Sequence, residues 1–171
     1  MATLAKERQV EIDAIIDDVK LKTGFAYPGG NLLDLADRVA VKVYLADLSE
    51  VDPDLSGIIK YDDDELKTNP RIYVSTHIPE NRQRFTLAHE LGHHFLHRGR
   101  KMRLDNLNYA QDTEDVLEES EANYFAASFL VPKVYLLRQL EEQHDLKRMA
   151  TTFGVSEAVI ENRIRWIATN D

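Results

Sequence analysis

Residues 84–94, RFTLAHELGHH, have the side chains of this chain best suited to metal chemistry. His89 and His93 are four residues apart, so on an α-helix they lie one turn apart on one face and can bind the same ion. Neutral imidazole is a good zinc ligand. Glu90 is rotated by about 100° from His89, so it can reach a zinc-activated water without being a ligand. This is the chemistry of the H-E-x-x-H motif.

The same stretch also fits an ordinary amphipathic helix that happens to carry histidines. Its other face is apolar and suited to core packing: Phe85, Ala88, Leu91, Gly92, Phe95 and Leu96. Gly92 costs a helix about 1 kcal/mol relative to alanine, which a close approach of another backbone would explain. The position of the motif within a helix, after a predicted strand and in a chain without cysteine, favours the metal site.

A third histidine, His97, continues the spacing of four from His93. It lies about 12 Å along the helix axis from His89, so a straight helix cannot bring all three to one ion. The metzincin pattern is excluded, because it needs glycine and histidine where this chain has Leu96 and Gly99. We interpret His94 and His97 as surface or ligand-supporting residues. We interpret His77 and His144 as solvated residues.

Composition limits the classes of function. The chain has 171 residues, 43% hydrophobic and 30% charged, as expected for one globular domain. A net charge of -9 disfavours binding to nucleic acid. Without cysteine, any metal must be held by His, Asp or Glu, and a reducing cytoplasm suits such a chain. No signal peptide or membrane-length apolar run is evident, so we predict a cytoplasmic protein with no membrane partner.

Apolar periodicity predicts an α+β fold. Strands are expected at 41–48, 56–61 and 71–76, and helices at 4–22, 31–40, 79–97, 114–131, 133–143 and in two short segments after 145. The short polar connections between strands suggest antiparallel neighbours. We therefore predict a small three-stranded antiparallel sheet packed with several helices, with the H-E-x-x-H helix central. The acidic run at 62–65 is interpreted as a solvated turn.

A catalytic zinc usually has three protein ligands, so a third residue must join His89 and His93. Residues 114–132 are the obvious source. Glu114, Glu118 and Glu121 share one helical face, whereas Glu119 points elsewhere. Burial next to the apolar stripe favours Glu121, with Glu118 as the alternative. These glutamates could also be solvated charges at a helix start, where the helix dipole favours them.

The segments RFTLAHELGHHFLH and ESEANYFAASFLVP, in this order, resemble the ImmA/IrrE family of zinc metallopeptidases. The stretches SGIIKY, RIYVST and MATTFGVSEAVIENRIRWI also fit, and the resemblance covers roughly residues 30–167. It implies a zincin-like, gluzincin-like fold in which Zn²⁺ is bound by His89, His93 and Glu121. It also implies that Glu90 is the catalytic base of a metalloendopeptidase.

The family resemblance further implies a partner. Such proteins are cytoplasmic regulators that commonly act on a helix-turn-helix repressor in mobile elements, prophages or stress responses. The predicted function is therefore cleavage of a protein substrate, with such a repressor as the expected one. The alternative is an anti-repressor or regulatory binding protein that does not cleave its partner and whose zinc site is structural or vestigial.

One position of this sequence differs from the pattern of thermolysin-like enzymes. Thermolysin-like enzymes have an aspartate four residues after the ligand glutamate to steady a histidine, and counting from Glu121 this position is Phe125. That support must come from Asn123 or a backbone carbonyl instead. The group that stabilises the oxyanion is left open among Tyr109, Tyr124 and Arg84.

Residues 146–167 resemble half of a helix-turn-helix, in which Arg163 and Arg165 could touch phosphate. Net acidity and the lack of a wider basic patch argue against this DNA-binding alternative, and we expect no direct contact with nucleic acid. The predicted organisation is one metallopeptidase-like domain with three parts: an N-terminal helix in 1–25, a catalytic core in 30–131, and C-terminal helices with a helix-turn-helix-like hairpin in 132–171.

Overall fold

The computed structural model describes residues 4–97 and 113–170. Its elements, in chain order, are α1 (Lys6–Thr23), α2 (Leu32–Arg38), β1 (Lys42–Ala46), β2 (Gly57–Lys60), β3 (Arg71–Ser75), α3 (Glu80–Leu96), α4 (Thr113–Leu130), α5 (Lys133–Glu141), α6 (Leu146–Phe153) and α7 (Glu157–Asn170). The predicted α+β class is confirmed. Within these described ranges, none of the helices is both long and apolar enough to span a membrane.

The sheet is mixed, with the strand order β1-β3-β2. β2 and β3 pair antiparallel, as predicted, with Ile58 opposite Tyr73. β1 pairs with β3 in parallel, with Tyr44 opposite Tyr73, so the prediction of a purely antiparallel sheet is wrong. The reason is burial: β3 buries Ile72 and Val74 and takes the centre, whereas β1 is largely exposed and stays at an edge. The segment between β1 and β2 therefore carries the chain to the far edge of the sheet.

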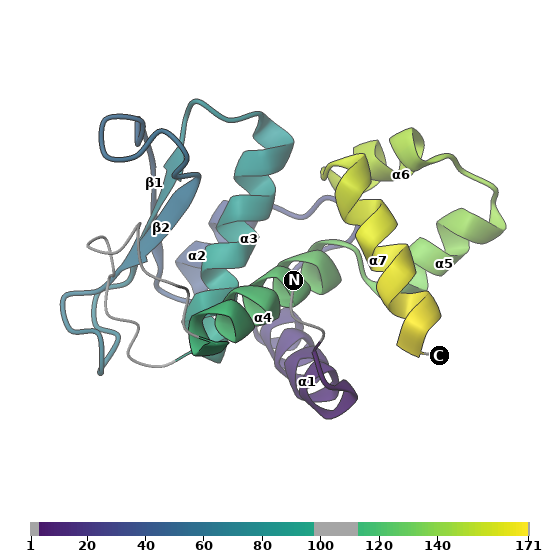
Figure 1. The fold of residues 1–171 in the computed structure, drawn as a ribbon, viewed down its shortest axis with the longest axis horizontal. Helices are drawn as coiled ribbons and strands as arrows, with labels where there is room; N and C mark the ends of the chain where they lie inside the picture. The colour runs from purple at the N-terminus through teal and green to yellow at the C-terminus, as the bar shows by residue number, and fades with distance from the viewer. Residues whose placement is uncertain (1–3, 98–112, 171) are drawn as a thin grey trace.

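Helix α3 is central, as the sequence predicts. It packs against β2 and β3 on one side and against α4 on another, and Figure 1 shows α4 crossing it. Leu87, Ala88 and Leu91 face the core and are buried. This burial holds in place the helix that carries the two motif histidines.

The crossing of α3 and α4 is close at Gly92. A Cβ atom at this position would lie 3.3 Å from the Cα atom of Ala122 and 3.1 Å from Cδ1 of Phe125. The predicted close approach of another backbone at Gly92 is therefore confirmed. It brings the N-terminal half of α4 to the face of α3 that carries the histidines.

The helices at the two ends of the chain meet on α4. On α1, the carboxylate of Asp13 accepts hydrogen bonds from the Tyr124 hydroxyl at 3.2 Å. Arg163 of α7 is buried, donates from Nε to the carbonyl of Val131 at 3.2 Å, and lies over the Tyr124 ring. Arg163 is thus committed to the core, while Arg165 is exposed. This arrangement weakens the DNA-binding alternative for the C-terminal hairpin.

Candidate metal centre

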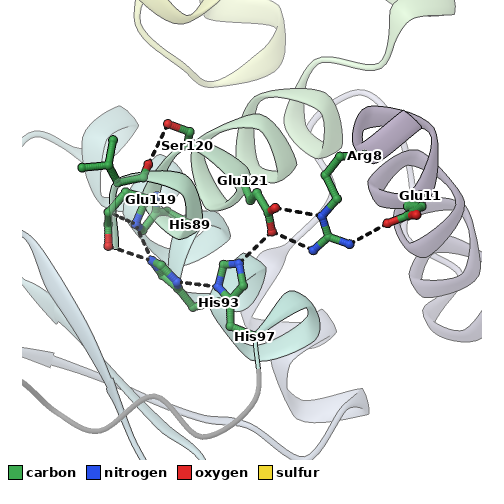
Figure 2. Close-up of polar contacts among 9 residues, drawn as sticks. Arg8, Glu11, His89, His93, His97, Glu119, Ser120 and Glu121 are labelled. Carbon is green, nitrogen blue, oxygen red and sulfur yellow. Dashed lines mark hydrogen bonds and ion pairs between the residues drawn. The ribbon is translucent and has the colours of Figure 1, made fainter. Parts of the chain in front are cut away.

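The two motif histidines converge on one point. Their Nε2 atoms are 3.0 Å apart and their ring centroids 4.7 Å apart. Figure 2 shows the two side chains pointing toward one another and toward Glu119. Both side chains come from one face of α3, one turn apart, as their spacing predicts. His93 is 2% exposed and His89 is half-buried, so the pair sits at the boundary between core and solvent.

Glu119 of α4 completes a cluster with them. Its carboxylate oxygens lie 3.3 Å from Nε2 of His89 and 3.3 Å from Nε2 of His93. The ligand atoms of the three residues all lie within 4.8 Å of one another. Burial raises the pKa of Glu119, but the two adjacent imidazoles outweigh it and hold that pKa well below its usual range. The cluster therefore carries an anionic carboxylate.

A hydrogen bond behind the cluster orients His89 for binding a cation. Nδ1 of His89 lies 3.2 Å from the side-chain oxygen of Asn123, which can only accept, so Nδ1 carries the proton. In a neutral ring, Nε2 of His89 then presents a lone pair toward His93 and Glu119. Two imidazoles and one carboxylate form the ligand set of a catalytic zinc site, in which the fourth position stays open.

Glu121, the ligand predicted from the sequence, is not brought to the two imidazoles. Its two oxygens accept hydrogen bonds from Nε and Nη2 of Arg8 at 2.8 and 2.6 Å. One of them also lies 3.0 Å from Nε2 of His97. The structure puts Glu119, which was expected to point elsewhere, beside His89 and His93. Glu118, the alternative, is also absent from the cluster.

The reason lies in the packing of α4. This helix is buried on two sides, against α3 and against α1, so its apolar stripe does not identify the face that meets α3. Glu119 is three residues before Ala122, the point of close approach, and so shares its face. Counted from Glu119, the position four residues later is Asn123, the residue that supports His89. A glutamate followed four residues later by a partner of His89 is therefore a signal that the sequence carried at Glu119 and that counting from Glu121 missed.

Glu90 lies beside the cluster without belonging to it. It is 6% exposed and follows His89 on α3, rotated away from the ligand pair. A Cβ atom on Gly57 of β2 would lie 3.6 Å from Cγ of Glu90, so the strand backbone passes close to this carboxylate. The position fits a base that works next to a metal ion rather than a ligand.

The other histidines occupy three kinds of environment. His97 is buried and its Nδ1 lies 2.9 Å from Nδ1 of His93, so it lies behind His93 rather than at the surface. His94 turns to Tyr61, 3.0 Å from the hydroxyl, and burial lowers its pKa to about 4. His77 pairs with an exposed aspartate and His144 with a glutamine.

The oxyanion candidates are engaged elsewhere or lie outside the described residues. The Tyr124 hydroxyl is bound to Asp13, and Nη1 of Arg84 donates to the carbonyl of Gly30 at 2.9 Å. Tyr109 lies outside the described residues. Neither Tyr124 nor Arg84 therefore faces the cluster in this arrangement.

Comparison with models of known protein families shows which family the chain belongs to. The family model described as Peptidase_M78, IrrE N-terminal-like domain, matches residues 36–165. The chain belongs to this family. The resemblance to ImmA/IrrE proteins is thereby confirmed, and the matched range of this Peptidase_M78 member contains the whole cluster of His89, His93 and Glu119. Arg8 lies outside it.

Other comparisons support the fold alone. No curated protein matches the chain. Among solved structures, a Mycobacterium tuberculosis transcriptional regulator matches with a TM-score of 0.57 and 17% sequence identity. The match covers 93% of this Peptidase_M78 member and 47% of that protein, so the chain spans about half the length of its structural neighbour.

Proposed function

We propose that this Peptidase_M78 member is a zinc-dependent metalloendopeptidase that hydrolyses a peptide bond in a protein substrate. The observation that carries the proposal is the convergence of His89, His93 and Glu119 beside Glu90. Membership in a peptidase family supports the reaction class. Glu119 takes the ligand role that the sequence pattern suggested for Glu121.

His89, His93 and Glu119 would hold the zinc ion, and a fourth position would stay open to solvent or substrate. When bound, zinc is a Lewis acid that makes water more acidic and polarises a carbonyl group. Asn123 keeps His89 oriented by accepting the hydrogen bond from Nδ1. The ligand pair itself is held by the burial of α3 between the sheet and α4.

Glu90 performs the proton transfers. Its carboxylate takes a proton from the attacking water, while the water oxygen forms a bond to the scissile carbonyl carbon. The same carboxyl then delivers that proton to the leaving amine nitrogen as the C–N bond breaks. One residue therefore serves as base and then acid, and the products are a carboxylic acid and an amine.

The edge strand β2 offers a place for an extended substrate. Among the described strands it forms one edge of the sheet, and its first residue, Gly57, packs against Thr86 and Glu90. A peptide segment that adds to this edge would run past Glu90, and backbone hydrogen bonds would align it. The absence of a side chain at Gly57 keeps the strand close to the catalytic helix.

The proposed substrate is a helix-turn-helix transcriptional repressor in the cytoplasm. This choice rests on the resemblance to ImmA/IrrE proteins. The structural neighbour is a transcriptional regulator, and a role in gene regulation is compatible with that likeness. Direct binding to nucleic acid is not part of the proposal, since the net charge is -9 and Arg163 is buried.

The test is cleavage of a candidate repressor by the zinc-loaded protein, followed by mass spectrometry of the fragments. Wild type is expected to cut at a defined bond, and Glu90→Gln is expected to retain zinc but not cut. A chelator supplies the metal-free control. Equal cleavage by Glu90→Gln and wild type would refute the role of Glu90, and inactivation of the repressor without fragments would favour the non-cleaving anti-repressor.

A further inference from the structure

A chain of hydrogen bonds connects the N-terminal helix to the metal centre. It runs from Arg8 of α1 to Glu121, from Glu121 to His97 at 3.0 Å, and from His97 to Nδ1 of His93 at 2.9 Å. Figure 2 shows these side chains in line, with His93 at the inner end. Glu121, His97 and His93 are all buried, so the chain is largely shielded from water.

The chemistry of the groups sets the direction of every bond. Nε and Nη2 of Arg8 donate to both oxygens of Glu121 at 2.8 and 2.6 Å, so Glu121 is the acceptor in this ion pair and has no proton to donate to His97. Nε2 of His97 must then donate to it. In a neutral His97 the other nitrogen, Nδ1, is an acceptor, so Nδ1 of His93 is the donor. This leaves the lone pair of His93 on Nε2, the atom that faces His89 and Glu119.

Arg8 fixes the outer end of the chain. Its guanidinium donates to both oxygens of Glu121, a forked contact that sets the plane of the carboxylate as well as its charge. The third contact of Arg8, to Glu11 at 2.8 Å, lies at the surface, where the Glu11 side chain is 62% exposed. Arg8 precedes residues 36–165, the range that the family model matches. The outer end of this row of hydrogen bonds therefore lies outside the matched range.

We propose that Arg8, Glu121 and His97 are positioning residues that hold His93 in the tautomer and orientation needed to bind zinc. Helix α1 then contributes to the metal centre through Arg8, which orients His93 by way of Glu121 and His97. The inference rests on the proposed function, because it requires His93 to be a ligand. It also gives Glu121 a role two imidazoles away from the ion rather than on it.

Two other roles for these residues need to be separated from this one. Arg8 and Glu121 could merely dock α1 onto α4, or Glu121 could itself bind the ion. The contact between Asp13 and Tyr124 also docks α1 onto α4 and does not touch His97, so Asp13→Ala is a matched control for docking. Glu11→Ala is the control for the exposed side of Arg8.

The experiment measures zinc affinity of the full chain by competition with a chromophoric chelator. Arg8→Ala and Glu121→Gln are expected to weaken binding by about 10-fold, the lower end of the range for residues that support a metal-binding histidine. Arg8→Lys restores the charge without the fork and is expected to recover affinity in part. Asp13→Ala and Glu11→Ala should leave affinity unchanged, even where Asp13→Ala lowers thermal stability.

A second readout follows the tautomer directly. Nitrogen NMR of the zinc-loaded protein should show His93 bound through Nε2 and protonated at Nδ1 in wild type, with exchange of the Nδ1 proton faster in Arg8→Ala. If Arg8 only docks α1, this proton should exchange at the same rate in Arg8→Ala as in Asp13→Ala. Folding of each variant is checked by its unfolding transition in the presence of chelator.

The outcomes are distinct. Equal loss of affinity in Arg8→Ala and Asp13→Ala, or no loss in Arg8→Ala and Glu121→Gln, would overturn the inference and leave the proposed function intact. Loss of zinc in Glu121→Gln as complete as in His93→Ala would make Glu121 a ligand and overturn the positioning role. If wild type itself bound no zinc, the proposed function would fall and the inference with it.

Discussion

Replacing Gly92 by alanine tests the crossing that brings Glu119 to the histidines. In a free helix this change stabilises by about 1 kcal/mol. Here the new Cβ atom would sit 3.3 Å from Cα and from the carbonyl oxygen of Ala122, and 3.1 Å from Cδ1 of Phe125. Two of these neighbours are backbone atoms and Phe125 is buried, so they cannot yield as the end of a flexible side chain could.

Overpacking of this kind costs about 2 kcal/mol, within the usual range for inserting a methyl group into a packed core. It exceeds the gain in helix propensity, so the expected result is a net loss of about 1 kcal/mol in the free energy of unfolding. Urea denaturation with chelator present measures this packing effect apart from any metal. Because α4 must move away to relieve the contact, zinc affinity should also fall in a titration without chelator.

The opposite result would refute the reasoning. A Gly92→Ala protein that is more stable by about 1 kcal/mol would show only the helix propensity. It would mean that the two helices are not in close contact at Gly92, and the geometric reason for assigning Glu119 to the cluster would be lost.

Three further predictions concern the site and its support. Glu119→Gln should remove zinc from the purified protein, measured by metal analysis, whereas Glu121→Gln should retain it at saturating zinc; the reverse pattern would restore Glu121 as the ligand. Gly57→Val should lower kcat/KM on a cleaved substrate, because a Cβ atom at this position would lie 2.4 Å from Cγ2 of Thr86 and push β2 away from α3. The loss should reach up to about 100-fold, the effect expected of a misplacement near 1 Å. Unchanged kinetics would show that the position of β2 does not matter for catalysis. Arg163→Ala should cost about 2 kcal/mol in urea denaturation, since Arg163 is buried and its loss removes the donor to the carbonyl of Val131, and a loss below about 0.5 kcal/mol, as for a surface substitution, would show that Arg163 is not a core residue.

Local features of the sequence were enough to locate the helix that carries the two motif histidines. The pairing of His89 and His93 follows from helical periodicity alone, because residues four apart must share a face whatever surrounds the helix. Gly92, which is unfavourable within a helix, likewise suggested a close neighbour, and the structure has one there. The support of His89 by Asn123 was also within reach, as one of two options.

Tertiary structure decided the rest. The parallel pairing of β1 with β3 depends on which strand is buried most, a property of the whole sheet rather than of the connections. Glu119 rather than Glu121 lies beside the two histidines because α4 is covered on two sides. Periodicity shows that both sides are buried but not which one faces α3 and which one faces α1. Arg8 meets Glu121 across 113 residues of sequence, and only the docking of α1 creates that contact. Spacing determines what lies on one face of one helix, while packing determines which faces meet.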